Sequence, residues 1–109
     1  MQGATLVHFP LGVRTAWHTH PAGQNLIVTQ GKIYTGTADG IVQIASPGDV
    51  VLCPKDVKHW HGARLHEDGE HIAVTFEKEG KNVKWLEHLS EDEYKNLVEK
   101  ADKDEKQME

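Results

Sequence analysis

The sequence predicts an all-β domain, either a closed barrel or a sandwich, followed by one C-terminal helix. Short segments rich in β-branched residues recur along residues 4–89, and turn residues separate them at regular intervals. These segments do not alternate with helical ones, which disfavours a parallel α/β sheet. Helical periodicity appears only after Ser90. With 109 residues the chain has room for one domain.

The expected strands of the first half are each closed by a turn signal. Pro10 and Gly12 end the first strand, residues 21–23 (Pro-Ala-Gly) end the second, and Gln30-Gly31 follows the third. Asp39-Gly40 is a hairpin signal between the fourth and fifth. The strands are therefore expected at residues 4–9, 15–20, 25–29, 32–37 and 41–45.

The second half continues the same pattern. Residues 47–49 (Pro-Gly-Asp) form a turn, a short apolar segment runs to Pro54, and the polar stretch 66–70 divides two further strands. These considerations place strands at residues 50–53, 59–64 and 72–77, with a last one at 82–88.

The C-terminal segment reads as one amphipathic helix. Ser90 and Glu93 have the spacing of a capping box, and acidic residues occupy the first turn. Apolar residues then recur at helical spacing up to Ala101. We expect a helix from residue 91 to about 102, with residues 103–109 frayed. We therefore divide the chain into a barrel over residues 1–89 and a helix with a charged tail over residues 90–109.

Composition excludes several partner classes. The net charge is −5, no basic patch is available to grip phosphates, and no apolar run is long enough to span a bilayer. We therefore expect neither nucleic acid nor membrane as a partner. Residues 1–4 carry neither a basic start nor an apolar core, so no secretory signal is expected. Cys53 is the single cysteine, so no intrachain disulfide forms and a cytoplasmic location is predicted.

Two pairs among the eight histidines suggest metal chemistry. Residues two apart in a strand face the same side, so His18 and His20 would project together from one wall. The Gln24 carbonyl oxygen and His59 complete a predicted set of four ligands, and His61 stays free on the same face. Two simpler interpretations remain open: the histidines form a hydrogen-bonded group without metal, or Gln24 lies outside the ligand set.

The order and spacing of these residues resemble the cupin superfamily. Residues 12–31, with His18, His20 and Gln24, are similar to its first motif, and residues 48–59, ending at His59, are similar to its second. The resemblance implies a jelly-roll barrel with a divalent metal bound in its mouth by these four residues. Most cupins have glutamate where this chain has Gln24. The neutral amide leaves the full charge of the metal uncompensated, which favours Lewis-acid chemistry.

A narrower resemblance is to the bacterial cupin-type hydroxynitrile lyases, on residues 14–29, 47–51, 59–63, 71–74 and 83–94. It implies manganese as the metal, while histidine and amide donors by themselves also suit iron, nickel or zinc. It also implies His61 and His71 as catalytic residues near the substrate. The same resemblance places Thr5, Val7 and Thr75 in the substrate pocket. The lyases usually carry a longer N-terminal segment, and residues 65–70 are more charged in this chain.

Three functions and one assembly state follow as hypotheses. The protein is a Lewis-acid lyase of small molecules, an iron-dependent dioxygenase, or a binding module without catalysis. His8, His66 and His88 are expected at the surface or in structural roles, and Cys53 in the core. The three tryptophans are assigned to the core or to a dimer interface. An unprotected first strand and these tryptophans predict a homodimer.

Overall fold

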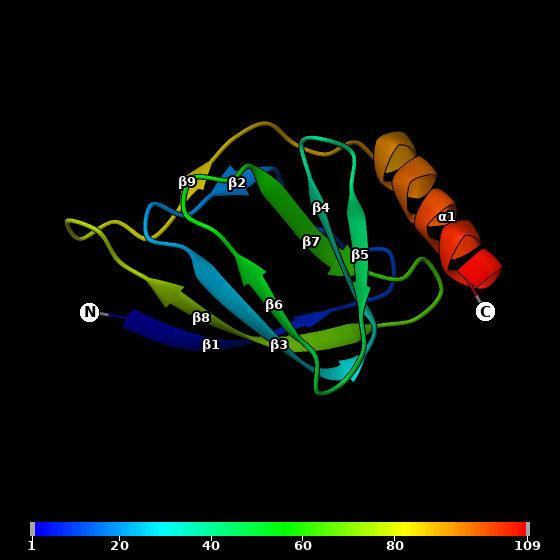
Figure 1. Cartoon of the computed structure of the whole chain (residues 1–109), viewed down its shortest axis with the longest axis horizontal. Coiled ribbons are helices and arrows are strands. Elements are labelled where there is room, and N and C mark those ends of the chain that lie inside the picture. The colour runs from blue at the N-terminus through cyan, green and yellow to red at the C-terminus, as the bar shows by residue number, and fades with distance from the viewer. Residues whose placement is uncertain (1, 109) are drawn as a thin grey trace.

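The computed structural model describes residues 2–108, and Figure 1 shows two facing sheets with one helix beside them. The predicted all-β class and the C-terminal helix are confirmed. Several strands differ from their predicted bounds by one to three residues. The elements are β1 Gln2–Phe9, β2 His18–Thr19, β3 Gln24–Gly31, β4 Ile33–Thr37, β5 Val42–Ala45, β6 Val50–Cys53, β7 His59–Ala63, β8 Gly69–Phe76, β9 Lys84–Trp85 and α1 Glu91–Met108.

The strands form two antiparallel sheets, which we call sheet A and sheet B. Sheet A has the order β1-β8-β3-β6, and sheet B has the order β5-β4-β7-β2-β9. Neighbours in the sheets are distant in sequence, as in the pairing of β1 with β8. This crossed order, with the two sheets face to face, is the jelly-roll arrangement.

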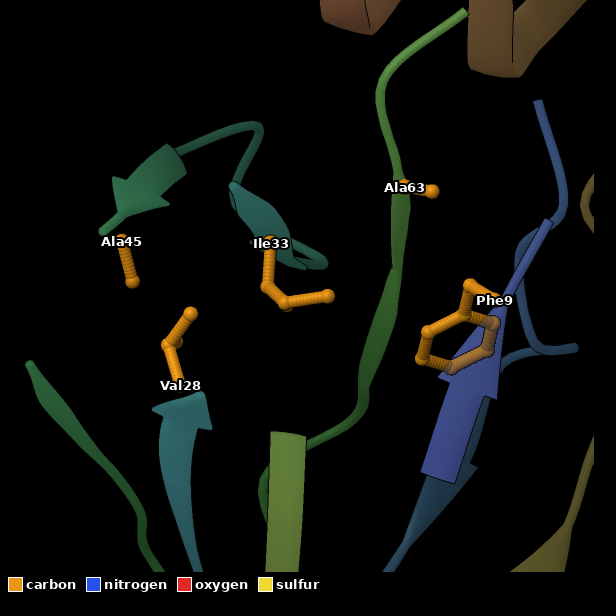
Figure 2. Packing of buried hydrophobic residues seen from close by; sticks show 5 residues of the cluster. All are labelled: Phe9, Val28, Ile33, Ala45 and Ala63. Atoms are coloured by element: carbon orange, nitrogen blue, oxygen red, sulfur yellow. The ribbon is translucent and has the colours of Figure 1, made fainter. Parts of the chain in front are cut away.

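The main core lies between the two sheets. Figure 2 shows five buried side chains from β1, β3, β4, β5 and β7 pointing toward one another across the gap. Alternation along each strand explains this, because every second residue faces inward. The residues are Phe9, Val28, Ile33, Ala45 and Ala63.

A second core lies on the outer face of sheet B, where α1 packs. Tyr34 and Trp60 project from β4 and β7 to meet Tyr94 and Val98 of the helix, and all four are fully buried or nearly so. The helix begins at the predicted cap, where the Glu93 amide donates to Ser90 Oγ at 3.1 Å.

The predicted end of the helix is wrong, because α1 continues to Met108. Contacts with the barrel hold its second half. Asp102 accepts a hydrogen bond from Tyr34 and lies 3.6 Å from Arg64, and Lys32 pairs with Glu105 at 3.2 Å. Tertiary contacts of this kind are not visible in local periodicity. Residue 109 lies outside the described residues.

The two strands at the mouth of the barrel are shorter than predicted. The segment expected at 15–20 is a strand only at His18–Thr19, and that expected at 82–88 only at Lys84–Trp85. Isolated backbone bonds replace the ladder on either side, such as Leu86 N to Trp17 O at 2.8 Å. In residues 2–108 no helix is both long and apolar enough to cross a membrane.

Candidate metal centre

The candidate site lies at one end of the barrel, where β2, β3 and β7 bring their polar residues together. Its pocket has a volume of about 260 Å³. A larger hollow of about 630 Å³ lies between β5 and α1, but no histidine lines it, so it is separate from this chemistry. The pocket walls are Thr5, Val7, Phe9, Thr15, His18, His20, Gln24, His61, Ala73, Thr75, Asn82, Val83 and Trp85.

Backbone carbonyls orient three of the imidazoles. The Nδ1 atom of His18 lies 2.9 Å from the carbonyl oxygen of Ala16. The Nδ1 atom of His20 lies 2.7 Å from the carbonyl oxygen of Asn82, and that of His59 lies 3.0 Å from the carbonyl oxygen of Val57. A carbonyl oxygen only accepts, so each Nδ1 carries the hydrogen and each Nε2 keeps its lone pair. Metal-binding histidines are typically held by such a bond on the other ring nitrogen.

Several ligand-type atoms in the site are buried without a partner. Nε2 of His20, Nε2 of His59 and Oε1 of Gln24 make no hydrogen bond. Gln24 Nε2 donates to Thr75 Oγ1 at 2.8 Å, which leaves the amide oxygen as the free end. Unpartnered buried acceptors are costly in a protein without a ligand. The donor set therefore fits a divalent metal, and the four-residue ligand set remains a prediction.

A second grouping of the histidines includes His61. One ring nitrogen each from His18, His59 and His61 lie within 4.8 Å of one another, and this three-histidine group could hold a metal ion. His20 is adjacent, with its ring centroid 4.9 Å from that of His18 and 5.2 Å from that of His59. His61 was predicted as a free residue beside the ligands, and the structure places it near enough to join them.

His61 and His71 form a buried pair across β7 and β8. His71 Nε2 lies 3.1 Å from His61 Nδ1, and Phe9 packs against both rings. His71 Nδ1 is buried without a partner. The hydrogen between the two rings can sit on either nitrogen, and His61 Nε2 is free to accept a proton when that hydrogen sits on His61 Nδ1.

Burial lowers the pKa of four histidines in the site and keeps them neutral near pH 7, namely His18, His59, His61 and His71. It lowers the pKa of His18 and of His71 to about 4, and the backbone bond to Ala16 only partly opposes the effect in His18. Burial also lowers the pKa of His59, and it lowers that of His61 well below the ordinary value, with His71 as the next cause. Neutral imidazole is the form that binds metal or accepts a proton.

All three predicted substrate-pocket residues, Thr5, Val7 and Thr75, line the pocket. The sequence did not single out Asn82, and it assigned Trp85 to the core or a dimer interface. Both residues line the pocket, and Trp85 is 61% exposed, so it does not lie in the core. Of the residues assigned elsewhere, His8 is at the surface near Asp68 and Cys53 is buried.

Comparisons with known proteins agree with this fold. Residues 5–75 match the family model described as "Cupin domain". An (R)-mandelonitrile lyase from Granulicella tundricola is 45% identical over 89 residues, which cover 82% of this chain and 68% of the lyase.

Solved structures resemble the chain as well. A cupin-like protein from Thermotoga maritima superposes with a TM-score of 0.85 at 39% identity, covering 90% of this chain and 74% of that one. The DMSP lyase DddQ from Ruegeria pomeroyi has a TM-score of 0.69 at 18% identity, with 78% and 43% coverage, and shares the fold.

Proposed function

The chain belongs to the cupin family, and from that premise we propose that it is a metal-dependent lyase of small neutral molecules, similar to the hydroxynitrile lyases. One observation supports this most. Backbone carbonyls fix three imidazoles, and Nε2 of His20, Nε2 of His59 and Oε1 of Gln24 are buried without a partner. His61, which pairs with His71 behind it, lines the same pocket.

We assign the metal to His18, His20, Gln24 and His59. A divalent ion bound there supplies a Lewis acid for an oxygen atom of the substrate. The identity proposed is manganese, while the same donors also suit iron, nickel or zinc. Gln24 is neutral, so the ligands cancel none of the charge of the ion. Metal analysis of protein purified without added metal tests the assignment.

His61 carries the proton in this proposal. Its Nδ1 is engaged by His71, which leaves Nε2 for the pocket. For a cyanohydrin, Nε2 takes the hydroxyl proton, the C–C bond breaks with its electron pair leaving on cyanide, and the proton is then delivered to cyanide. The products are an aldehyde and hydrogen cyanide, with no change of oxidation state in the protein. His71 holds the ring of His61 in place.

The pocket favours an uncharged, partly apolar substrate. Val7, Phe9, Ala73 and Val83 supply apolar walls, and no Asp, Glu, Lys or Arg is among the described residues that line it. A charged substrate would lose its hydration here without gaining a counter-ion. Mandelonitrile, the substrate named for the relative from Granulicella tundricola, has the expected character.

The test is cleavage of mandelonitrile by manganese-loaded protein, followed as release of benzaldehyde. His18→Ala should lose metal and activity together, whereas His61→Ala should keep the metal and lose most of the activity. Wild-type activity no greater than that of His18→Ala would refute the lyase proposal. Metal retention in His18→Ala would refute the ligand assignment.

One observation favours an iron-dependent dioxygenase as the second candidate. The group of His18, His59 and His61 supplies three neutral nitrogens, a donor set that also suits iron. Oxygen uptake with catechols, diketones or thiols under iron loading separates this candidate from the lyase. Ligand binding without turnover in either assay would indicate a non-catalytic binding module. We also propose a cytoplasmic location, because the single cysteine forms no intrachain disulfide.

A further inference from the structure

Trp85 is an exposed aromatic side chain that lines the metal pocket. Its exposed fraction is 61%, whereas Trp60 is fully buried and Trp17 is partly buried in the core beneath α1. Among residues 2–108 no other phenylalanine, tyrosine or tryptophan side chain is exposed. Single exposed apolar residues are common on proteins, but this one stands at the mouth of the pocket that the candidate metal ligands line.

The main chain places the indole of Trp85 beside a metal ligand. β9 pairs with β2, and Trp85 lies directly opposite His18 in the antiparallel register (Figure 1). Side chains directly opposite each other point to the same face, so the indole and His18 share the pocket side. The two ring centroids are 4.8 Å apart, with the ring planes tilted by 49°. Main-chain bonds hold this strand, such as that from the Leu86 amide to the Trp17 carbonyl oxygen at 2.8 Å.

The pocket has room for a small ring between the candidate ligands and Trp85. Its volume of about 260 Å³ equals that of about nine water molecules at about 30 Å³ each, which suits a molecule of about ten non-hydrogen atoms. Val83 adds an apolar wall from the same segment as Trp85. A substrate whose oxygen atom lies at the metal centre therefore extends its apolar end toward the indole.

We propose that Trp85 determines substrate specificity by stacking on an aromatic ring of the substrate. The proposal rests on the lyase function for the oxygen that binds the metal, and it adds the side chain that recognises the other end. Aromatic rings attract each other through their uneven charge distribution, in offset or edge-to-face arrangements with centroids about 4.5–7 Å apart. A saturated ring of the same size gains only the burial of its surface. Trp85 thus favours an aryl group over a cyclohexyl group.

The size of this preference follows from ring pairs in proteins. Beyond their buried area, such pairs change an equilibrium constant by about twofold to about twelvefold. The stacking is present in the bound substrate and in the transition state alike, so its loss should raise KM and leave kcat nearly unchanged. A side chain that acted only on the metal through His18 would instead change kcat or the metal content.

Two substitutions at Trp85 in the full-length, manganese-loaded protein test the proposal. Trp85→Leu keeps an apolar side chain without a ring, and Trp85→Phe keeps a ring. Ile41→Ala is the control, since Ile41 is 59% exposed but lies in the β4–β5 turn. Benzyl alcohol and cyclohexylmethanol, which have equal numbers of non-hydrogen atoms, are the binding probes in calorimetric titrations. The ratio of kcat/KM for mandelonitrile and its cyclohexyl analogue is measured beside them, together with the metal content of each variant.

In Trp85→Leu the preference for benzyl alcohol over cyclohexylmethanol should fall by about twofold to about twelvefold, with the metal retained. The ratio of kcat/KM should fall in parallel through KM, and Trp85→Phe and Ile41→Ala should keep both preferences. Absence of mandelonitrile cleavage by the wild type would refute the lyase function alone, because the two alcohols still report on Trp85.

Four outcomes would overturn the proposal for Trp85. The wild type binds neither alcohol. Trp85→Leu keeps the preference of the wild type. Trp85→Leu loses the metal together with both alcohols, which would give the indole a structural role on His18. Trp85→Leu abolishes a self-association of the wild type, measured by sedimentation, and leaves the preference unchanged, which would place the indole in a contact between two copies.

Discussion

Thr75 controls the orientation of Gln24, and removing its hydroxyl group should weaken metal binding. Thr75 Oγ1 accepts the hydrogen bond from Gln24 Nε2 at 2.8 Å, and this bond distinguishes the two ends of the amide. Thr75→Val keeps the shape of the side chain and removes the acceptor. The amide can then turn over and point Nε2, which has no lone pair to offer, toward the ligand position.

The size of the effect follows from burial. Gln24 is only 6% exposed, so an unpaired Nε2 costs about 1–3 kcal/mol in the variant. The Gln24 amide can avoid part of that cost by rotating, which removes its oxygen from the ligand position. We therefore expect the metal affinity to fall about tenfold, or by about 1.4 kcal/mol, as for other residues that orient metal ligands. Thr75→Ser keeps the hydroxyl and should bind metal about as tightly as the wild type.

Competition titration against a chelator measures the affinities. In a Gln24→Ala background, Thr75→Val should have no further effect, because the amide that it orients is gone. The reasoning is refuted by Thr75→Val binding metal within twofold of the wild type. It is equally refuted by a tenfold loss that persists in the Gln24→Ala background.

Three further predictions concern acid, metal removal and the helix. Without metal, stability should be full above pH 6.5 and fall as the pH drops toward 4. In the unfolded chain His18 and His71 take up protons near their ordinary pKa of 6.5, whereas burial in the folded protein lowers their pKa to about 4. The resulting loss in the free energy of unfolding is at most about 3 kcal/mol for each histidine, and urea titrations at several pH values measure it. Chelation with EDTA should lower the melting temperature of the wild type and leave that of His18→Ala unchanged. Asp102→Ala should cost about 1–2 kcal/mol in urea unfolding by removing the acceptor of Tyr34, whereas Asp104→Ala on the same helix should cost less than about 0.5 kcal/mol.

Local sequence was enough to predict the parts of the site that depend on strand geometry. His18 and His20 are two residues apart, so their side chains point to the same side of the chain. The turn at residues 21–23 then brings Gln24 to the start of β3. His59 pairs directly with His18 across β2 and β7. The sequence suggested this contact only through the order of the two motifs, because strand pairing at long range leaves no local signal.

Contacts between distant strands account for what the sequence did not predict. The bond from Gln24 to Thr75 joins β3 to β8, and the His61–His71 pair joins β7 to β8. Each depends on register, and a slip of one residue would turn the side chain to the other face. The length of α1 also depended on partners outside the helix, chiefly Tyr34 on β4.

The carbonyls that orient the three imidazoles belong to the main chain, and no point substitution deletes a main-chain carbonyl. Residues that line the pocket can therefore be exchanged for a new substrate while the tautomers of His18, His20 and His59 stay fixed. The orientation of the imidazoles depends instead on the lengths of the loops that carry these carbonyls. Asn82 presents its carbonyl to His20 from the connection between β8 and β9, so one inserted or deleted residue there would displace it. Engineers can vary the apolar side chains of the pocket, such as Val7 and Val83, while they keep Thr75 and the loop lengths.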